Sequence, residues 1–366
     1  MNRFIHYISI IILAISHYLQ AQNSDKITRV LEYKPAPGQH INRLFPTPSM
    51  SNTYNDALQF ANNTLINNKS YLGLGAYGGY VVVGFDHSII NIAGEYDFKV
   101  LGNASFNGAE PGIVMVCQDL NKNGLPDPDE PWFELAGSEY SKAETIKNYE
   151  ISYYRPTPDK QKSNIAWTDN QGNSGVITHI SFASQATMYP LWIDSDTLTF
   201  RGTKLKNNVT GGGSNWQLPA YDWGYADNQA NNSAIDKIGF KIDWAVDING
   251  NSVHLDYIDF IKIYTAVSQE AGWLGETSTE VAGVVDLHPQ ETDNRSSTTE
   301  QVYKAIKAYR SGNIIYNLPI GGKIKIYSIS GTIYKQCEIE TTKMEIPKDE
   351  MFIIWISTDE GYKIIR

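Results

Sequence analysis

Short runs of β-branched and aromatic residues recur along most of this chain, and turn residues separate them. The clearest runs are Tyr80–Phe85, Ile113–Cys117 and Tyr257–Ala266. Further runs of this kind are Asp97–Leu101, Tyr149–Tyr154, Val176–Phe182, Leu191–Leu205 and Ile238–Trp244. The pattern predicts strands, and it lacks the periodicity of long helices. We therefore expect residues 70–286 to form an all-β domain, a jelly-roll-like β-sandwich.

The part of the chain before this domain has a different pattern. Residues 22–52 are rich in Pro, Asn and Ser, which indicates an extended segment that wraps the domain. The apolar positions between residues 53 and 69 are spaced as in a short helix. Residues 22–69 are therefore predicted to be an extended lead-in that ends in a short helix.

The first 21 residues have the pattern of a signal peptide. Arg3 precedes the apolar run Ile8–Ile15, and the small residue Ala21 stands at the expected cleavage point. The apolar run is too short to span a bilayer. The sequence thus predicts export, a mature chain that starts near Gln22, and no transmembrane segment in that mature chain.

The last part of the chain, residues 301–366, follows a polar linker at residues 287–300 and again alternates between apolar and polar positions. It resembles the C-terminal sorting domain of type IX secretion substrates in Bacteroidetes, although Met351 stands where that family usually has Gly. The features that carry the resemblance are the strand Lys323–Tyr327, Gly331, an apolar strand near 352–356 and the basic ending Lys363 and Arg366. The resemblance implies a small C-terminal β-sandwich, recognition by the type IX secretion machinery, and release or attachment at the outer-membrane surface. An ordinary small β-domain is the alternative.

The most specific motif lies in the middle of the chain. Residues Asp119–Glu130 match the calcium-loop pattern D-x-[DN]-x-[DN]-G-x5-E at every specified position. The loop is flanked by strand-like runs, so it is predicted to be a structural clip on a β-domain; a turn with solvated acids is the alternative. The expected ligands of a structural Ca²⁺ are the side chains of Asp119, Asn121, Asn123, Asp127 and Glu130 and the carbonyl of Leu125.

Two other loops match the calcium-loop pattern less well. Asp247–Asn251 has no Glu at the closing position, and its Asn249-Gly250 pair is a strong hairpin signal. For Asp169–Asn173, a polar loop is likewise favoured over a cation site. Both loops are therefore interpreted as turns, and a second cation there remains the alternative.

A Gly-rich segment carries the candidate ligand-binding residues. It places Trp and Tyr rings among Gly, Pro and Asp, and such rings offer flat faces with polar tips on which sugars and planar macrocycles stack. The alternative is that the rings pin a long loop to the edge of the domain. The candidate residues are Trp216, Tyr221, Trp223 and Tyr225, together with Trp273 from a later Gly-flanked turn.

Charge limits the classes of partner. The chain has 30 basic and 40 acidic residues, and residues 22–300 hold 19 and 33 of them, a net charge of −14. Nucleic acids and anionic lipids bind basic surfaces, so both are disfavoured. An acidic surface suits divalent cations and neutral polyhydroxylated ligands better.

Residues 70–285 resemble uncharacterised cell-surface proteins of gut Bacteroidetes. The blocks that carry this resemblance are Gly79–Asp86, Asp97–Asn103, Glu110–Val116, Trp132–Tyr140 and Gly275–Val281. Such proteins often accompany outer-membrane nutrient uptake, and some bind corrinoids or glycans. The resemblance implies binding but transfers no site residue.

Catalytic motifs are not readable in the chain. It has neither a G-x-S-x-G nor an H-E-x-x-H motif, and its histidines are scattered. We therefore expect a secreted or surface protein, not an enzyme, that is stabilised by calcium and binds carbohydrate. A corrinoid or other nutrient is the second ligand class. An adhesin and a glycan-active enzyme that uses an acidic pair are further alternatives.

Overall fold

The computed structural model describes residues 23–42, 53–66, 70–157, 163–180, 187–291, 308–311, 313–328, 333–347, 352–358 and 361–365. The predicted signal peptide (1–21), most of the predicted linker (287–300), Gly331, Met351 and Arg366 lie outside these residues. The chain forms two compact units, Met1–Thr292 and Asp293–Arg366, which are described separately.

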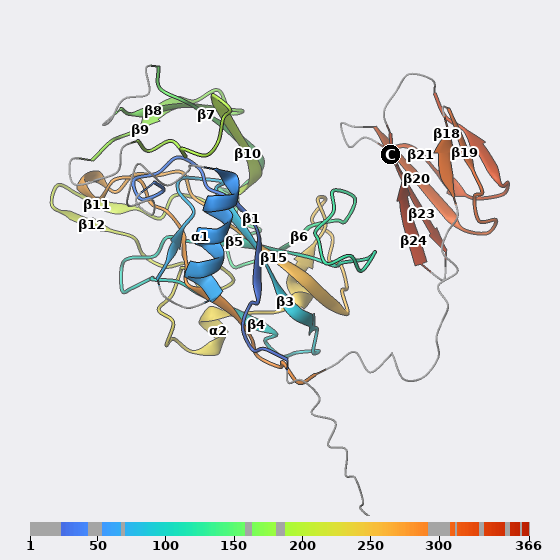
Figure 1. Ribbon diagram of the computed structural model, residues 1–366, viewed down its shortest axis with the longest axis horizontal. Coiled ribbons are helices and arrows are strands. Elements are labelled where there is room, and N and C mark those ends of the chain that lie inside the picture. The colour runs from blue at the N-terminus through green and yellow to red at the C-terminus, as the bar shows by residue number, and fades with distance from the viewer. Residues whose placement is uncertain are drawn as a thin grey trace, which may run out of the picture. The chain divides into compact units, whose positions relative to one another are not determined.

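The first unit is built on two large antiparallel sheets (Figure 1). One sheet consists, in spatial order, of β1 (Arg29–Lys34), β3 (Tyr80–Ile90), β15 (Tyr257–Thr265), β5 (Gly112–Cys117), β6 (Phe133–Leu135) and β14 (Ala245–Val246). The other consists of β10 (Thr197–Lys204), β7 (Ile146–Tyr154), β8 (Ile165–Asp169) and β9 (Ser174–Ile177). The prediction of an all-β, sandwich-like fold is confirmed.

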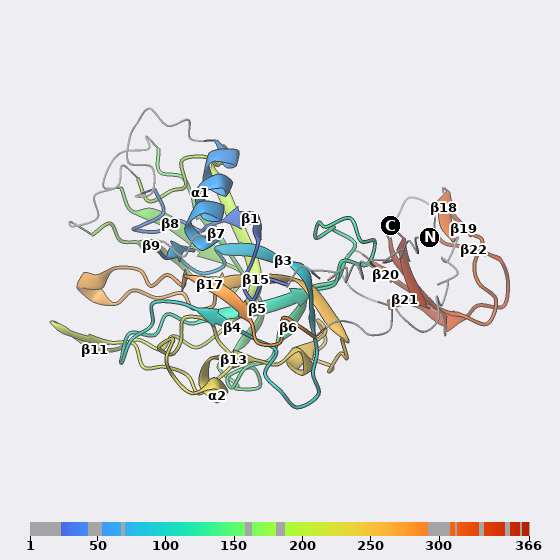
Figure 2. The ribbon, with the colours of Figure 1, turned by 60° about the horizontal axis from the view of Figure 1, so that its bottom comes forward.

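Smaller sheets complete the first unit (Figure 2). A three-stranded sheet contains β13 (Gly239–Phe240), β4 (Phe98–Leu101) and β17 (Gly283–Asp286). Two strand pairs are β2 (Leu72–Gly73) with β16 (Glu280–Val281), and β11 (Thr210–Gly212) with β12 (Asn215–Gln217). The short helices are α2 (Ile235–Ile238), η1 (Ile242–Trp244) and η2 (Gly272–Leu274).

The six-stranded sheet is buried on both faces. Val81 and Ile263 point into one core, which includes residues of β4, β17 and the N-terminal helix. Ile113 and Tyr264 point into a second core, where Ile151, Phe200 and other residues of the four-stranded sheet cover them. Because most of both faces is covered, its strands have nearly continuous apolar runs, and these are the strongest strand signals in the sequence.

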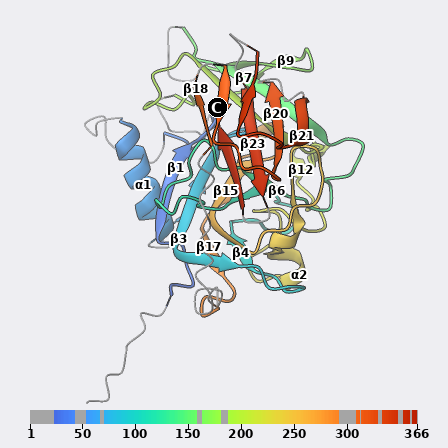
Figure 3. The same cartoon turned by 90° about the vertical axis from the view of Figure 1, so that its right-hand side faces the viewer.

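The predicted short helix is present as α1 (Tyr54–Ile66), which lies beside β1 (Figure 3). Thr53 begins it: the Thr53 hydroxyl accepts a bond from the Asp56 amide, and the Asp56 carboxylate accepts one from the Thr53 amide. The Asn62 side chain then exchanges hydrogen bonds with the backbone of Val30. No helix within the described residues is both long and apolar enough to cross a membrane.

Three predicted strands are shorter than expected. The run Leu191–Leu205 is a strand only over β10, and the described part of the run Val176–Phe182, up to Ile180, is a strand only to Ile177. The run Ile238–Trp244 breaks into β13 and η1. The cause of the break is a residue distant in the sequence: the buried Asp97 carboxylate accepts the Ile242 amide at 2.7 Å, so a side chain takes the hydrogen bond that a neighbouring strand would have taken.

The second unit also consists of two antiparallel sheets around an apolar core. One sheet contains β18 (Tyr309–Ser311), β19 (Ile314–Tyr316) and β22 (Lys343–Glu345). The other contains β21 (Ile333–Glu338), β20 (Lys323–Ser328), β23 (Phe352–Thr358) and β24 (Gly361–Ile365). Ile315 of the first sheet and Ile324 and Ile354 of the second are fully buried in one core, so this unit has an independent hydrophobic interior.

A histidine links β3 to the last strand of the first unit. His87 of β3 contacts Asp86 through Nδ1 and Asp286 of β17 through Nε2, each at 2.7 Å. The Asp86 carboxylate also accepts the amide of Ser24, near the start of the described chain. Burial lowers the pKa of His87, but the hydrogen bonds and charges of Asp286 and Asp86 outweigh it, so the pKa is raised above the usual value.

This contact predicts a pH-dependent stability. The pKa of His87 is higher in the folded state than in the unfolded state, so its stabilising effect is complete below about pH 6.5 and is lost as pH rises through the folded pKa. We expect His87→Gln to lower the free energy of unfolding by about 1–3 kcal/mol at pH 6 and by less at pH 9. Urea unfolding at the two pH values measures this. An equal loss at both pH values would contradict a charged His87.

Candidate functional site

The 119–130 loop connects β5 to β6, so it joins strands as the sequence predicted. Two residues of its first half have positive φ: Lys122 at 58° and Gly124 at 81°. Gly124 thus stands at the sharp turn, where a conformation with positive φ favours glycine. The turn brings the side chains of the loop's first half back toward those of its second half.

The predicted ligand side chains converge inside the loop. The Asp119 carboxylate accepts the amides of Asn123 and Gly124 at 3.1 and 2.7 Å. The Asp127 carboxylate accepts the side-chain amides of Asn121 and Asn123, each at 2.6 Å. Because an Asn side chain can exchange its oxygen and nitrogen by rotation, these groups can present oxygens at the same point. The donor set of the loop therefore fits a hard cation.

Glu130 closes the loop. It is buried, and its two carboxylate oxygens accept the amides of Leu120 at 2.7 Å and Asp127 at 2.9 Å. Burial raises its pKa, and the charge of Asp119 adds to this. Outside the loop, Asp259 of β15 accepts the Asp119 amide at 2.7 Å and contributes a further negative charge. A cation of charge +2 would offset this accumulation of carboxylates.

In the two loops that match the calcium pattern less well, Asp169–Asn173 and Asp247–Asn251, the Asp side chain stabilises a turn. Asp169 accepts the backbone amides of Gln171 and Asn173, and Asp247 accepts those of Asn249 and Asn251. These are the hydrogen bonds of Asx turns, which fix a chain reversal without a ligand. The geometry is that of the turns predicted for both loops.

The predicted aromatic loop does not form one surface. Tyr225 is buried: its ring lies against Gly137, and its hydroxyl accepts the Glu139 amide at 2.9 Å. Trp223 packs on Trp244 with ring centroids 4.6 Å apart. Tyr221 packs edge-on against Tyr225 and donates its hydroxyl to the Lys206 carbonyl. The prediction that Tyr225 stacks on a ligand is wrong, because its ring is buried. All three residues attach the loop to the domain.

Trp216 and Trp273 are arranged differently. Trp216 lies on β12, and its ring covers Gly272 so closely that a Cβ there would lie 2.1 Å from its Nε1. Gly272 also has a φ of 55°. The next residue, Trp273, is 57% exposed. The structure thus brings together these two predicted ligand residues, which are far apart in the sequence.

An additional exposed ring lies on an adjoining segment. Phe106 is 93% exposed, and its neighbour Asn107 accepts the amide of Leu218, which follows β12. The hairpin β11–β12 and the η2 turn lie at one end of the unit (Figures 1 and 2). We call Phe106, Trp216 and Trp273 the aromatic surface. Sequence reasoning missed Phe106 because a single Phe between polar residues gives no pattern.

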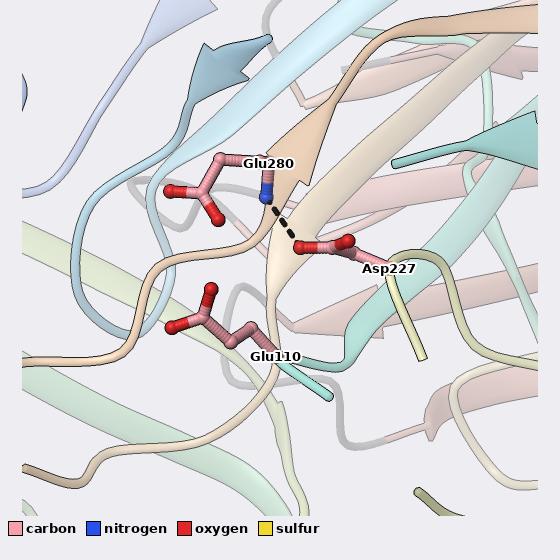
Figure 4. A group of neighbouring side chains, drawn as sticks. All are labelled: Glu110, Asp227 and Glu280. Atoms are coloured by element: carbon pink, nitrogen blue, oxygen red, sulfur yellow. Dashed lines mark hydrogen bonds between the residues drawn. The ribbon is translucent and has the colours of Figure 1, made fainter. Parts of the chain in front are cut away.

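A group of carboxylates was also missed. Glu110, Asp227 and Glu280 come from three separate segments, and one oxygen of each lies within 4.8 Å of the others (Figure 4). Asp227 is buried and holds three backbone amides, those of Asn103, Ala104 and Glu280, each at 2.8 Å. We call these three acids the carboxylate cluster. Their only sequence signal was that Glu110 and Glu280 lie in the blocks of the cell-surface resemblance.

Burial and mutual charge disfavour the ionisation of all three acids of the cluster at once. Burial raises the pKa of Asp227 to about 8, and the charge of Glu110 contributes. Burial also raises the pKa of Glu110, and that of Glu280 is raised further by its two acidic neighbours. Within the described ranges, no ion pair to Lys, Arg or His involves any of the three.

The calcium loop generates a direct prediction. Ca²⁺ should bind residues 119–130 of the folded chain and stabilise it by RT ln(1 + [Ca²⁺]/Kd), roughly 2.7 kcal/mol at a hundredfold excess over Kd. We expect the melting temperature to fall by several degrees in EDTA and expect Glu130→Gln to remove most of that difference. Asp129→Asn is the matched control, because Asp129 is an exposed acid of the same loop outside the ligand pattern. If wild type and Glu130→Gln respond equally to EDTA, the loop does not bind calcium.

Comparison with known proteins adds nothing to what the residues of the chain indicate. No protein-family model matches the sequence, and no curated protein matches it either.

Proposed function

We propose that the first unit is a calcium-stabilised binding module of an exported protein, and that carbohydrate is its ligand. The observation that carries the proposal is the aromatic surface: Trp273 and Phe106 are exposed to solvent, Trp216 packs on Gly272 next to Trp273, and the segment of Phe106 is hydrogen-bonded to the chain after β12. Exposed aromatic rings that lie on adjoining segments are typical of ligand-binding surfaces, and sugar rings stack on them through their C–H faces.

The rigidity of the surface supports a binding role. The Nε1 of Trp216 donates to the Gly213 carbonyl at 3.0 Å, which fixes the ring within its hairpin. The η2 turn is closed by the hydrogen bonds of Ala271 and Gly275. A ligand that meets preformed rings loses less conformational entropy on binding than one that must order them.

Charge favours a neutral ligand. The first unit is strongly acidic, so an uncharged, hydroxyl-rich ligand approaches it without electrostatic cost. A corrinoid or another planar nutrient is the second candidate, because exposed rings also stack on a flat macrocycle. An adhesive role would use the same surface against another protein.

Binding is tested with a glycan array and a cobalamin titration on the mature protein. Burial of one Trp face contributes about 1.5–3 kcal/mol, so Trp273→Ala should weaken the ligand found by about 10- to 100-fold. Tyr71→Ala is the control, since Tyr71 is an exposed ring outside the aromatic surface. Undiminished binding in a Trp216→Ala/Trp273→Ala double variant contradicts this surface, and turnover of the glycan contradicts a pure binding role.

Export is a separate part of the proposal. The signal-peptide pattern of residues 1–21 and the resemblance of residues 301–366 to a sorting domain support passage through the type IX secretion machinery. We expect mature protein from the native envelope or medium to begin near Gln22 and to lack most of residues 301–366. Intact-mass analysis measures both ends. A retained tail on the exported protein would contradict the sorting role.

A further inference from the structure

Several buried oxygens in Glu280 and in the segment that precedes it have no hydrogen-bond donor. The buried side chains concerned are Glu276 and Thr277, 3% and 2% exposed, whose Oε2 and Oγ1 have no partner. The Oε2 of Glu280 and the Oε1 of Gln39, next to Glu276, are also unpartnered. Buried acceptors of this kind are rare in folded proteins, and each calls for a donor or a cation.

Glu276 belongs to the surroundings of the cluster. Its carboxylate interacts through charge with Glu110 and with Glu280, and its Oε1 accepts the Gln39 amide at 2.9 Å. Its other oxygen is therefore a buried acceptor near two acids of the cluster. These carboxylates would repel one another strongly if all were ionised.

We propose that Glu110, Asp227 and Glu280 bind a divalent cation of the calcium class, at a site separate from the 119–130 loop. The spacing fits this ion: Ca²⁺ lies about 2.3–2.6 Å from its oxygens, so one ion bridges carboxylate oxygens up to about 5 Å apart. The observed limit of 4.8 Å falls within that span. Carboxylate, hydroxyl and amide oxygens are the ligands that such a hard cation takes.

Each member has a defined part in the site. The Asp227 carboxylate has roughly four acceptor positions, and backbone amides occupy three of them. It therefore holds the segments of Asn103 and Glu280 in place and offers at most one oxygen to the ion. Glu110 accepts the Ser278 amide only weakly, at 3.3 Å, and Glu280 has a free oxygen. These two glutamates are the main charged ligands, and Glu276 is next to them.

The position of the site gives it a consequence for binding. Glu110 is four residues from Phe106, and Glu276 is three residues from Trp273. An extended chain covers at most about 3.6 Å per residue, so the backbones of Phe106 and Trp273 lie within roughly 15 Å of an acid of this group. A bound cation would therefore hold together the segments that carry these two rings.

The test counts Ca²⁺ ions on the mature chain. After EDTA treatment and removal of the chelator, titration calorimetry with Ca²⁺ alone should give two ions for wild type and one for Glu280→Gln. The Glu130→Gln variant separates the two sites: if the 119–130 loop does not bind, wild type takes one ion, which Glu280→Gln removes and Glu130→Gln leaves. Glu134→Gln is the matched control, because Glu134 is another half-buried acid but is hydrogen-bonded to Thr203 and faces Lys147.

A cluster that binds protons and no cation would give a different result. If the cluster only shares protons, Glu280→Gln relieves repulsion, raises the melting temperature equally in EDTA and in Ca²⁺, and leaves the number of bound ions unchanged. That outcome would overturn the site. Gln has the shape of Glu, and Glu110→Gln provides a second variant with the same expected loss of one ion. Circular dichroism of both variants checks that they are folded.

Discussion

The pairing of β15 with two strands from the first half of the domain is the constraint on which the rest of the first unit depends. Residues Tyr257–Thr265 lie between β3 on one side and β5 on the other. Their side chains enter both apolar cores, since Ile261 packs in one and Tyr264 in the other. Long-range antiparallel pairing of this kind closes a large chain loop, and the lost entropy is recovered only when both faces are covered.

Polar chemistry is found where this packing ends. The 119–130 loop begins just after the last apolar residues of β5, and Asp259 of β15 accepts the first amide of that loop. At the other end of the same strands, Glu110 precedes β5 and lies in the carboxylate cluster. The sheet therefore positions two groups of acids, one at each end of β5. Rigid strands hold such groups better than loops do, because their backbone is fixed by the ladder.

The sequence predicted what local pattern controls. Continuous apolar runs gave β3, β5 and β15, and the spacing of loop 119–130 gave a convergent set of oxygens. Patterns failed where a distant side chain decides the outcome. Asp97 ends a predicted strand by capturing the Ile242 amide, and Gly137 receives the ring of Tyr225. The carboxylate cluster unites residues from three segments, and no local spacing indicates which acids will meet.

The contact between His87 and Asp286 has a consequence for the order of folding. Asp286 lies on the last strand of the unit, and its amide donates to the carbonyl of Asp25, near the first described residues. Lys26 also forms a bridge with Val285. Hydrogen bonds thus join the two ends of the unit, and these bonds cannot form until residue 286 has left the ribosome. The unit can therefore complete its fold only after its last strand has been synthesised.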